Sequence, residues 1–196
     1  MTWAALETIG ETDDIGDLPA MKHIVTAIDG SDHAYKAFDF AVDLAQKYGA
    51  RLTAVHVISD RPLTEGERRM AENEYLGDVV EGLNLGGLME SKGDPRLFAR
   101  ELLGKHGETG LRVRRAIGHR YLDEAKSRAH HKGFREIDTS VEEGDPADEI
   151  LAAAERVGAD VIVTGSRGLG NITGALLGSV SHKVAQRATC TCINVK

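Results

Sequence analysis

The sequence predicts an α/β fold: one open sheet of five parallel strands with helices on both faces, three layers in all. Three observations lead to this prediction. Residues 23–58 read as strand, helix and strand with short connections, which requires a right-handed crossover and parallel strands. Residues 121–195 continue the alternation of helices and strands. A glycine-rich segment, 165–180, separates a buried strand from the last helix.

The first strand–helix–strand unit is well marked. Residues 23–28 form a β-branched, apolar run that is typical of a buried strand. Residues 32–48 carry apolar side chains at helical spacing, and either Ser31 or Asp32 can cap that helix. A second apolar run at 52–58 predicts the neighbouring strand. Because these connections are short, the unit is expected to form the centre of the sheet.

The second half of the chain supplies the other elements. Asp145 precedes Pro146, and this pair is typical of a helix start, with the aspartate as N-cap and the proline at the first helical position. We expect helices at 121–132, 147–157 and 179–188, and strands at 137–141, 159–164 and 190–195.

Composition and charge limit the possible functions. A chain of 196 residues that is 41% hydrophobic suits one domain, which we place at 21–196. The net charge of -7 argues against a general nucleic-acid binder, and no apolar run is long enough to span a membrane. Residues 1–20 lack the basic and apolar regions of a secretory signal. They are expected to be an acidic, poorly ordered leader of a cytoplasmic protein, or else an added helix or partner-binding arm.

Two further regions carry weaker predictions. Residues 60–118 are expected to be an insertion after the second strand, either a mobile surface segment with a helix at about 95–105 or a lid or oligomer contact. Cys190 and Cys192 lie two apart near the end of the chain and point to one face of a strand. A disulfide between them is disfavoured, and a zinc site needs more ligands, so we expect reduced thiols.

The glycine-rich segment has the features of an anion site. A buried strand ends at about Thr164, glycines follow, and Ser179 is a candidate N-cap for the last helix. Glycines let a backbone approach a ligand closely, and helix N-termini present N–H groups with a positive dipole. The segment is therefore expected to bind phosphate. Alternatively, it is a connection that only turns the chain.

The glycine spacing distinguishes among phosphate-binding loops. The Gly-Lys-Ser/Thr triplet of a Walker loop is absent, and the dinucleotide fingerprint fails because Gly170 is followed by Gly174, one residue late. Gly165, two residues, Gly168, nine residues and Gly178-Ser179 resemble the signature of the universal stress protein family. The Asp29-Gly30-Ser31 turn, His56-Val57-Ile58 and Gly144-Asp145-Pro146 resemble other elements of that family. The resemblance covers about 22–58 and 119–196.

The resemblance implies a flavodoxin- or Rossmann-like sheet of order 3-2-1-4-5, with ligands bound outside the carboxyl ends of the strands where strands 1 and 4 meet. Many members of the family bind ATP. Asp29 suits a ribose hydroxyl or an adenine edge, and the Arg167 guanidinium suits phosphate. Alternatively, Asp29 only caps a helix, Arg167 is a solvated charge, and Ser179 is only a cap. The implied nucleotide-binding residues are Ala27, Asp29, Gly30, Ser31, Val57, Thr164, Gly165, Arg167, Gly168, Gly178, Ser179 and Val180.

The function we expect is that of a cytoplasmic stress-response protein that binds ATP and responds by a change of conformation or partner. Mg²⁺ or Mn²⁺ would be held through the phosphates, with no metal ligand from side chains. Whether the protein is an enzyme stays open: a slow ATPase is one alternative, with His182 as the nearest candidate base and no catalytic residue assigned. A nucleotide-free interaction protein is another. By resemblance, the final strand, 190–195, is expected to form a homodimer.

Overall fold

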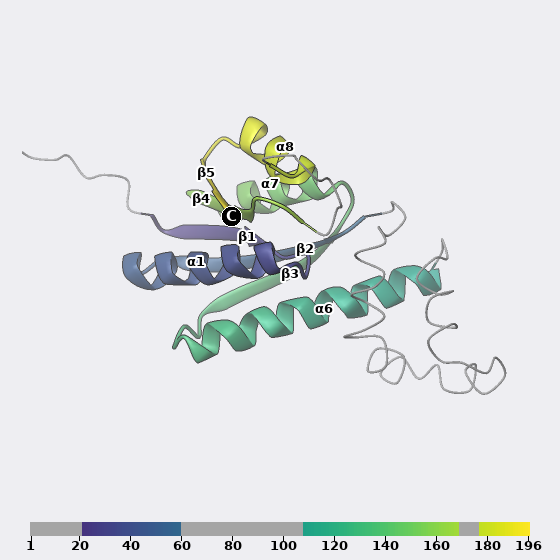
Figure 1. Ribbon diagram of the computed structural model, residues 1–196, viewed down its shortest axis with the longest axis horizontal. Helices are drawn as coiled ribbons and strands as arrows, with labels where there is room; N and C mark the ends of the chain where they lie inside the picture. Colours follow the sequence, from purple (N-terminus) through teal and green to yellow (C-terminus); the bar gives the residue numbers. More distant parts are fainter. Residues whose placement is uncertain (1–20, 60–107, 169–176) are drawn as a thin grey trace, which may run out of the picture.

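The computed structural model describes residues 21–59, 108–168 and 177–196. Its five strands form one parallel sheet of order β3-β2-β1-β4-β5, which confirms the predicted fold (Figure 1). The strands are β1 (His23–Ala27), β2 (Arg51–Ile58), β3 (Ile137–Glu143), β4 (Val161–Gly165) and β5 (Thr191–Val195). The helices are α1 (Asp32–Tyr48), α6 (Glu108–His131), α7 (Pro146–Val157) and α8 (Ser179–Arg187).

Two hydrophobic clusters, one on each face, hold the sheet between its helices. Helices α1 and α6 cover one face, and α7 and α8 cover the other (Figure 1). Successive residues of β1 point to opposite faces, so Ile24 packs toward α1 while Val25 packs toward α7. Both side chains are fully buried, and this explains why the central strands read as continuous apolar runs.

The residues that precede α1 and α7 cap these helices as the sequence predicts. The Ser31 hydroxyl accepts a hydrogen bond from the Ala34 N–H (3.2 Å), so Ser31 rather than Asp32 caps α1. The Asp145 carboxylate accepts from the N–H groups of Ala147 and Asp148 at the start of α7. These contacts satisfy helix N–H groups that have no intrahelical partner.

Helix α6 is longer than the sequence predicts. It begins at Glu108 rather than Tyr121, so residues 108–118, which the sequence analysis places in an insertion, are helical. Gly118 interrupts the apolar pattern there. A Cβ on Gly118 would lie 2.4 Å from the His56 ring, and the missing side chain therefore lets α6 lie close to β2.

Other boundaries shift by a residue or two: β3 continues to Glu143, and Cys190 lies just before β5. Both cysteine thiols are free and half-buried. The predictions for the leader at 1–20, for the helix at about 95–105 and for residues 169–176 lie outside the described residues. In the described ranges, no helix combines the length and apolar character needed to cross a bilayer.

Candidate functional site

The turn after β1 is held in one conformation by three contacts. The Asp29 Oδ1 accepts a hydrogen bond from the Ser31 N–H (3.0 Å), and Gly30 adopts a left-handed φ of 84°. The Tyr121 ring of α6 lies against Gly30, where an added Cβ would come within 2.5 Å of the ring. His56 Nδ1 donates to the Ile28 carbonyl (2.8 Å). The half-buried Asp29 carboxylate therefore projects from a fixed backbone.

The end of β4 lies directly against the first turn of α1. A Cβ on Gly165 would be 2.8 Å from both the carbonyl carbon and the carbonyl oxygen of His33, and these are backbone atoms that cannot rotate away. Close packing of a strand on a helix therefore requires glycine at this position. The next residue, Ser166, donates its N–H to the Val195 carbonyl (2.6 Å) and so ties the start of the loop to β5.

Two hydrogen bonds hold the two described ends of the glycine-rich segment together. The Gly178 N–H donates to the Ser166 carbonyl (2.7 Å), and the buried Ser181 hydroxyl donates to the Gly165 carbonyl (2.6 Å). The N-terminus of α8 is thereby fixed beside the carboxyl end of β4. This is the strand, loop and helix arrangement from which phosphate sites are built.

The N-cap of α8 differs from the prediction. Gly178, with φ −68° and ψ 155°, is the N-cap, and Ser179 is an exposed first helical residue, so the expectation that Ser179 caps the helix is wrong. Gly178 is the residue with extended backbone because the Gly178 N–H is held by the Ser166 carbonyl. As glycine has no side chain, the N-cap makes no side-chain hydrogen bond to the first turn. A Cβ there would meet its neighbours only at ordinary contact distances of 3.5 Å and beyond.

The turn after β1 and the loop after β4 meet at one point. A Cβ on Gly168 would be 2.4 Å from Asp29 Oδ2, so the exposed Gly168 backbone lies directly beside this carboxylate. The two residues are far apart in sequence. Their strands are neighbours at the centre of the sheet, where the strand order reverses. The structure thus brings together the turn and the loop that the sequence analysis assigned to one crevice.

The remaining candidate residues differ in how exposed their side chains are. Thr164 is buried, and its hydroxyl donates to Asn194 Oδ1 (2.8 Å), which is a contact between β4 and β5. Arg167 is exposed beside Gly168. Three half-buried apolar side chains pack toward the α7 face at this end of the sheet: Ala27, Val57 and Val180.

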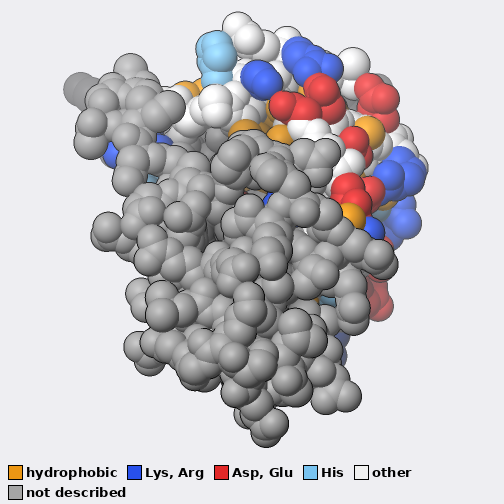
Figure 2. All heavy atoms as spheres, turned by 90° about the vertical axis from the view of Figure 1, so that its right-hand side faces the viewer, with side chains coloured by type: hydrophobic (Ala, Val, Ile, Leu, Met, Phe, Trp, Pro, Cys, Tyr) orange, Lys and Arg blue, Asp and Glu red, His pale blue; other side chains and the backbone are white. Residues whose placement is uncertain are grey.

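Charge at this end of the molecule is mixed rather than concentrated. Figure 2 views the side to which the carboxyl ends of the strands point, and acidic and basic side chains alternate over its described part. One such pair joins Lys183 Nζ to Asp145 Oδ2 (3.3 Å) across α8 and α7. The His182 side chain is exposed in α8, and the His182 backbone N–H donates to the Gly178 carbonyl (2.9 Å). Among the described residues, no three His, Cys, Asp or Glu side chains are grouped to hold a metal ion.

Three residues that support the site were not among the predicted site residues: His56, Tyr121 and Ser181. His56 and Tyr121 form an edge-to-face ring pair, with centroids 5.4 Å apart, that lies under the turn after β1. Tyr121 is 4% exposed and sits in an apolar stripe, so the pattern indicates only a core position. Ser181 lies two residues after Ser179, and no local pattern distinguishes the serine that bridges to β4.

Comparison with known proteins agrees with the fold and with the glycine spacing. The profile described as the universal stress protein family matches residues 21–196. A universal stress protein of Bacillus subtilis, YxiE, is 34% identical over 173 residues, covering 88% of this chain and 97% of that protein.

Solved structures of the same fold include the universal stress protein UspA from Lactobacillus plantarum. It superposes with a TM-score of 0.59 at 21% identity, covering 90% of this chain and 98% of the other. Another is a universal stress protein in complex with cAMP, with a TM-score of 0.56 at 24% identity and coverage of 90% and 98%. At these identities the structural likeness speaks for the fold alone, whereas the family profile and the sequence identity to YxiE extend over most of the chain. The chain therefore belongs to the universal stress protein family.

Proposed function

We propose that this universal stress protein binds an adenine nucleotide, ATP in the first instance, in the crevice between the turn after β1 and the loop after β4. The observation that carries the proposal is the close approach of the Gly168 backbone to the Asp29 carboxylate, next to the anchored N-terminus of α8. A ribose contact and a phosphate contact then lie on adjacent elements. A relative of the same fold has been solved with cAMP, and this supports the choice of an adenine nucleotide.

The phosphate end of the proposed site is formed by the start of α8. The N-cap Gly178 offers no side-chain acceptor to the N–H groups of the first turn, so phosphate oxygens can accept from them. The exposed Arg167 guanidinium and the exposed Ser179 hydroxyl add donors from the side. Mg²⁺ or Mn²⁺ would be held through the phosphate oxygens.

The nucleoside end is formed by the carboxyl ends of β1 and β2. Asp29 would accept from a ribose hydroxyl, and the half-buried Ala27 and Val57 would supply apolar contacts for the base. Gly30 and Ser31 fix the turn that carries Asp29. Thr164 and Gly165 contribute by placing the loop backbone, because their own contacts are to β5 and to α1.

The output we propose is a nucleotide-dependent change of conformation or partner during a stress response in the cytoplasm. A homodimer is part of this proposal, since β5 is an edge strand and unpaired strand edges favour pairing with a second copy. Light scattering at micromolar concentration tests the dimer, and a purely monomeric protein would remove it. A slow ATPase is the competing outcome, which ADP accumulating from bound ATP would reveal.

The decisive experiment compares Gly178→Asp with Gly178→Asn. Asparagine and aspartate are equally good N-caps, and a Cβ at this position fits, so both variants should fold. They differ by one negative charge at the proposed phosphate position. At an effective dielectric constant of about 20 and a separation of about 5 Å, that charge costs roughly 3 kcal/mol, or about 100-fold in affinity.

Calorimetric titration should therefore show much weaker ATP binding to Gly178→Asp than to Gly178→Asn. Adenosine, which carries no phosphate, should bind both variants equally. If ATP binds both folded variants with the same affinity, no phosphate lies at the start of α8, and the nucleotide-free interaction protein becomes the better hypothesis.

A further inference from the structure

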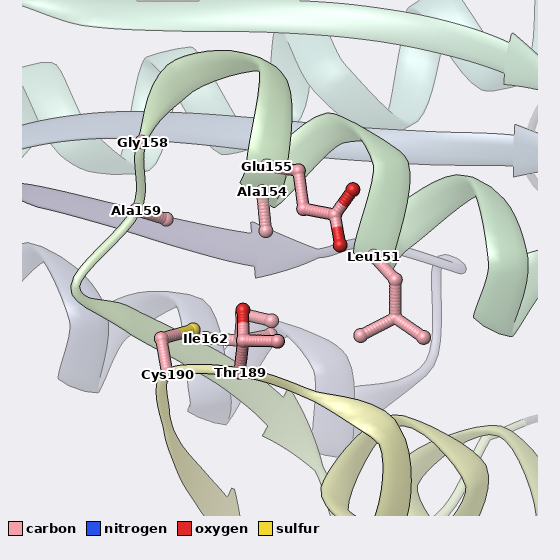
Figure 3. A pocket seen from close by; sticks show the side chains of 8 residues that line it. All are labelled: Leu151, Ala154, Glu155, Gly158, Ala159, Ile162, Thr189 and Cys190. Carbon is pink, nitrogen blue, oxygen red and sulfur yellow. The ribbon is translucent and has the colours of Figure 1, made fainter.

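A hollow lies at the end of the sheet opposite the proposed nucleotide site. A cavity of about 260 Å³ opens between α7, β4 and the connection from α8 to β5 (Figure 3). Its lining is mixed: Leu151, Ala154 and Ile162 supply apolar side chains, while Glu155, Thr189 and Cys190 add polar groups. The nucleotide proposed above has no use for this cavity, because the cavity borders the start of β4 and the nucleotide crevice lies beyond its end.

The chain enters the sheet next to this cavity. The N–H groups of Lys22 and His23 donate to Asp160 Oδ2 at 2.7 and 3.0 Å, and His23 Nδ1 donates to the Val157 carbonyl (3.2 Å). Gly158 and Ala159, which lie between these two contact points in sequence, line the cavity. The start of β1, to which residues 1–20 are joined in sequence, therefore lies beside the cavity.

The leader, residues 1–20, contains a possible occupant. It combines five acidic residues and no lysine or arginine with a neutral, apolar start, Met1 to Leu6, and it lies outside the family match. Trp3 is the only tryptophan of the chain. Trp3 precedes Lys22 by nineteen residues. A random coil of that length has a root-mean-square span of roughly 25 Å, enough to reach a cavity beside Lys22.

We propose that Trp3 of the leader docks into this cavity on its own chain. A cavity of about 150 Å³ can hold a benzene ring, so about 260 Å³ suits the larger indole. The volume falls below the roughly 300–1,000 Å³ of usual small-molecule pockets, which favours a side chain over a free ligand. The tether gives the indole an effective concentration in the millimolar range, and weak apolar contacts then suffice. The acidic part of the leader stays in solvent, away from Glu155.

Tryptophan fluorescence tests the proposal directly in the full chain, because all the signal comes from Trp3. Emission should lie at shorter wavelength than that of a peptide of residues 1–20. The variant Thr189→Phe, at an exposed position that lines the cavity, should shift the emission to that of the peptide. Thr191→Phe is the matched control, since it places the same side chain at an exposed position outside the cavity lining and should change nothing.

Thiol labelling provides a second measurement. The variant Cys192→Ser leaves Cys190 as the single thiol, and an aromatic disulfide reagent can label it. In this background, the additional change Trp3→Ser should make the labelling about tenfold faster. This factor is equivalent to about 1.4 kcal/mol of docking free energy. Peptide-like emission from the unmodified chain would overturn the proposal. Emission that Thr189→Phe leaves unchanged, or whose blue shift vanishes on dilution because the leader docks on a second copy, would overturn it as well. Neither measurement involves nucleotide, so a result that overturns the docking of Trp3 leaves the proposed nucleotide binding untouched.

Discussion

The two ends of the parallel sheet are held by different kinds of contact. At the amino end, side chains close the structure: His23 is 2% exposed, its Nε2 accepts from the Thr53 hydroxyl at 2.8 Å, and Asp160 holds two backbone N–H groups of the entering chain. At the carboxyl end, backbone and glycines dominate. Gly165 and Gly168 let the loop backbone pack directly against His33 and Asp29, and the Asp29 carboxylate stays half-buried.

This difference reflects the polarity of a parallel sheet. Crossover connections return to the amino ends of strands, whereas the loops at the carboxyl ends lead into helix N-termini, where N–H groups and the dipole favour an anion. Side-chain hydrogen bonds at the amino end therefore serve stability, whereas the glycine backbone at the carboxyl end forms part of the nucleotide site that we propose. Mutations at the two ends should consequently separate stability from binding.

The largest effect we expect is at Gly165, where the carboxyl end of the sheet also carries stability. Gly165→Ala forces a Cβ to within 2.8 Å of the α1 backbone, so either β4 or α1 must move. The free energy of unfolding should fall by about 3 kcal/mol. Urea unfolding measures it. Gly178→Ala is the control: its Cβ meets only ordinary contacts, so it should lose no more than about 1 kcal/mol, the cost of alanine as a poorer N-cap. Equal stability of the two variants would show that β4 and α1 can separate at no cost.

At the amino end, Asp160→Ala should cost about 2 kcal/mol of stability, because it leaves the N–H groups of Lys22 and His23 without their acceptor. ATP affinity should not change, since the residue lies at the start of β4, away from the crevice. Urea unfolding and calorimetric titration of the same preparation give both quantities. Weakened ATP binding in this variant would mean that the two ends of the sheet are coupled.

At the carboxyl end, Asp29→Ala should have the opposite profile. Adenosine binding should weaken by about 1.5 kcal/mol if a ribose hydroxyl donates to this carboxylate. Asp29→Asn is the control for the turn, because its amide oxygen can still accept from the Ser31 N–H. Should adenosine bind Asp29→Ala as well as it binds the unmodified protein, Asp29 would serve only to shape the turn.

The smallest effect concerns pH. Burial, together with the nearby positive charge of Arg51, lowers the pKa of His23 below its usual value of about 6.5. The unfolded chain therefore takes up a proton first as pH falls, and the free energy of unfolding should decrease from about pH 6.5 downward through the folded-state pKa of His23. The N–H groups of Lys22 and His23 lower the pKa of Asp160, whose contribution is lost only below about pH 4.

Urea unfolding between about pH 7 and pH 5 measures this slope, and His23→Gln should flatten it. An unchanged slope in the His23 variant would assign the pH dependence to other groups.

The sequence by itself determined what depends on neighbours along the chain. Buried central strands appear as continuous apolar runs, and Asp145 with Pro146 marks the start of α7 because a cap acts on N–H groups two and three residues away. The same holds for the end of α1, where Gly49 adopts a left-handed φ of 64°. The sheet order and the meeting of Asp29 with the glycine loop came from the spacing of the glycines, through the resemblance to a family.

Only the tertiary structure decided what depends on partners distant in sequence. Gly178 rather than Ser179 caps α8 because the Gly178 N–H is already bound to Ser166, and a serine in the sequence carries no sign of that contact. Helix α6 begins at Glu108, although Gly118 interrupts its apolar pattern, because that glycine accommodates the His56 ring. The cavity between α7, β4 and the connection from α8 to β5 likewise joins three separate segments. Such contacts are set by packing across the sheet. Local propensity does not predict them, because the partners are brought together only when the sheet forms.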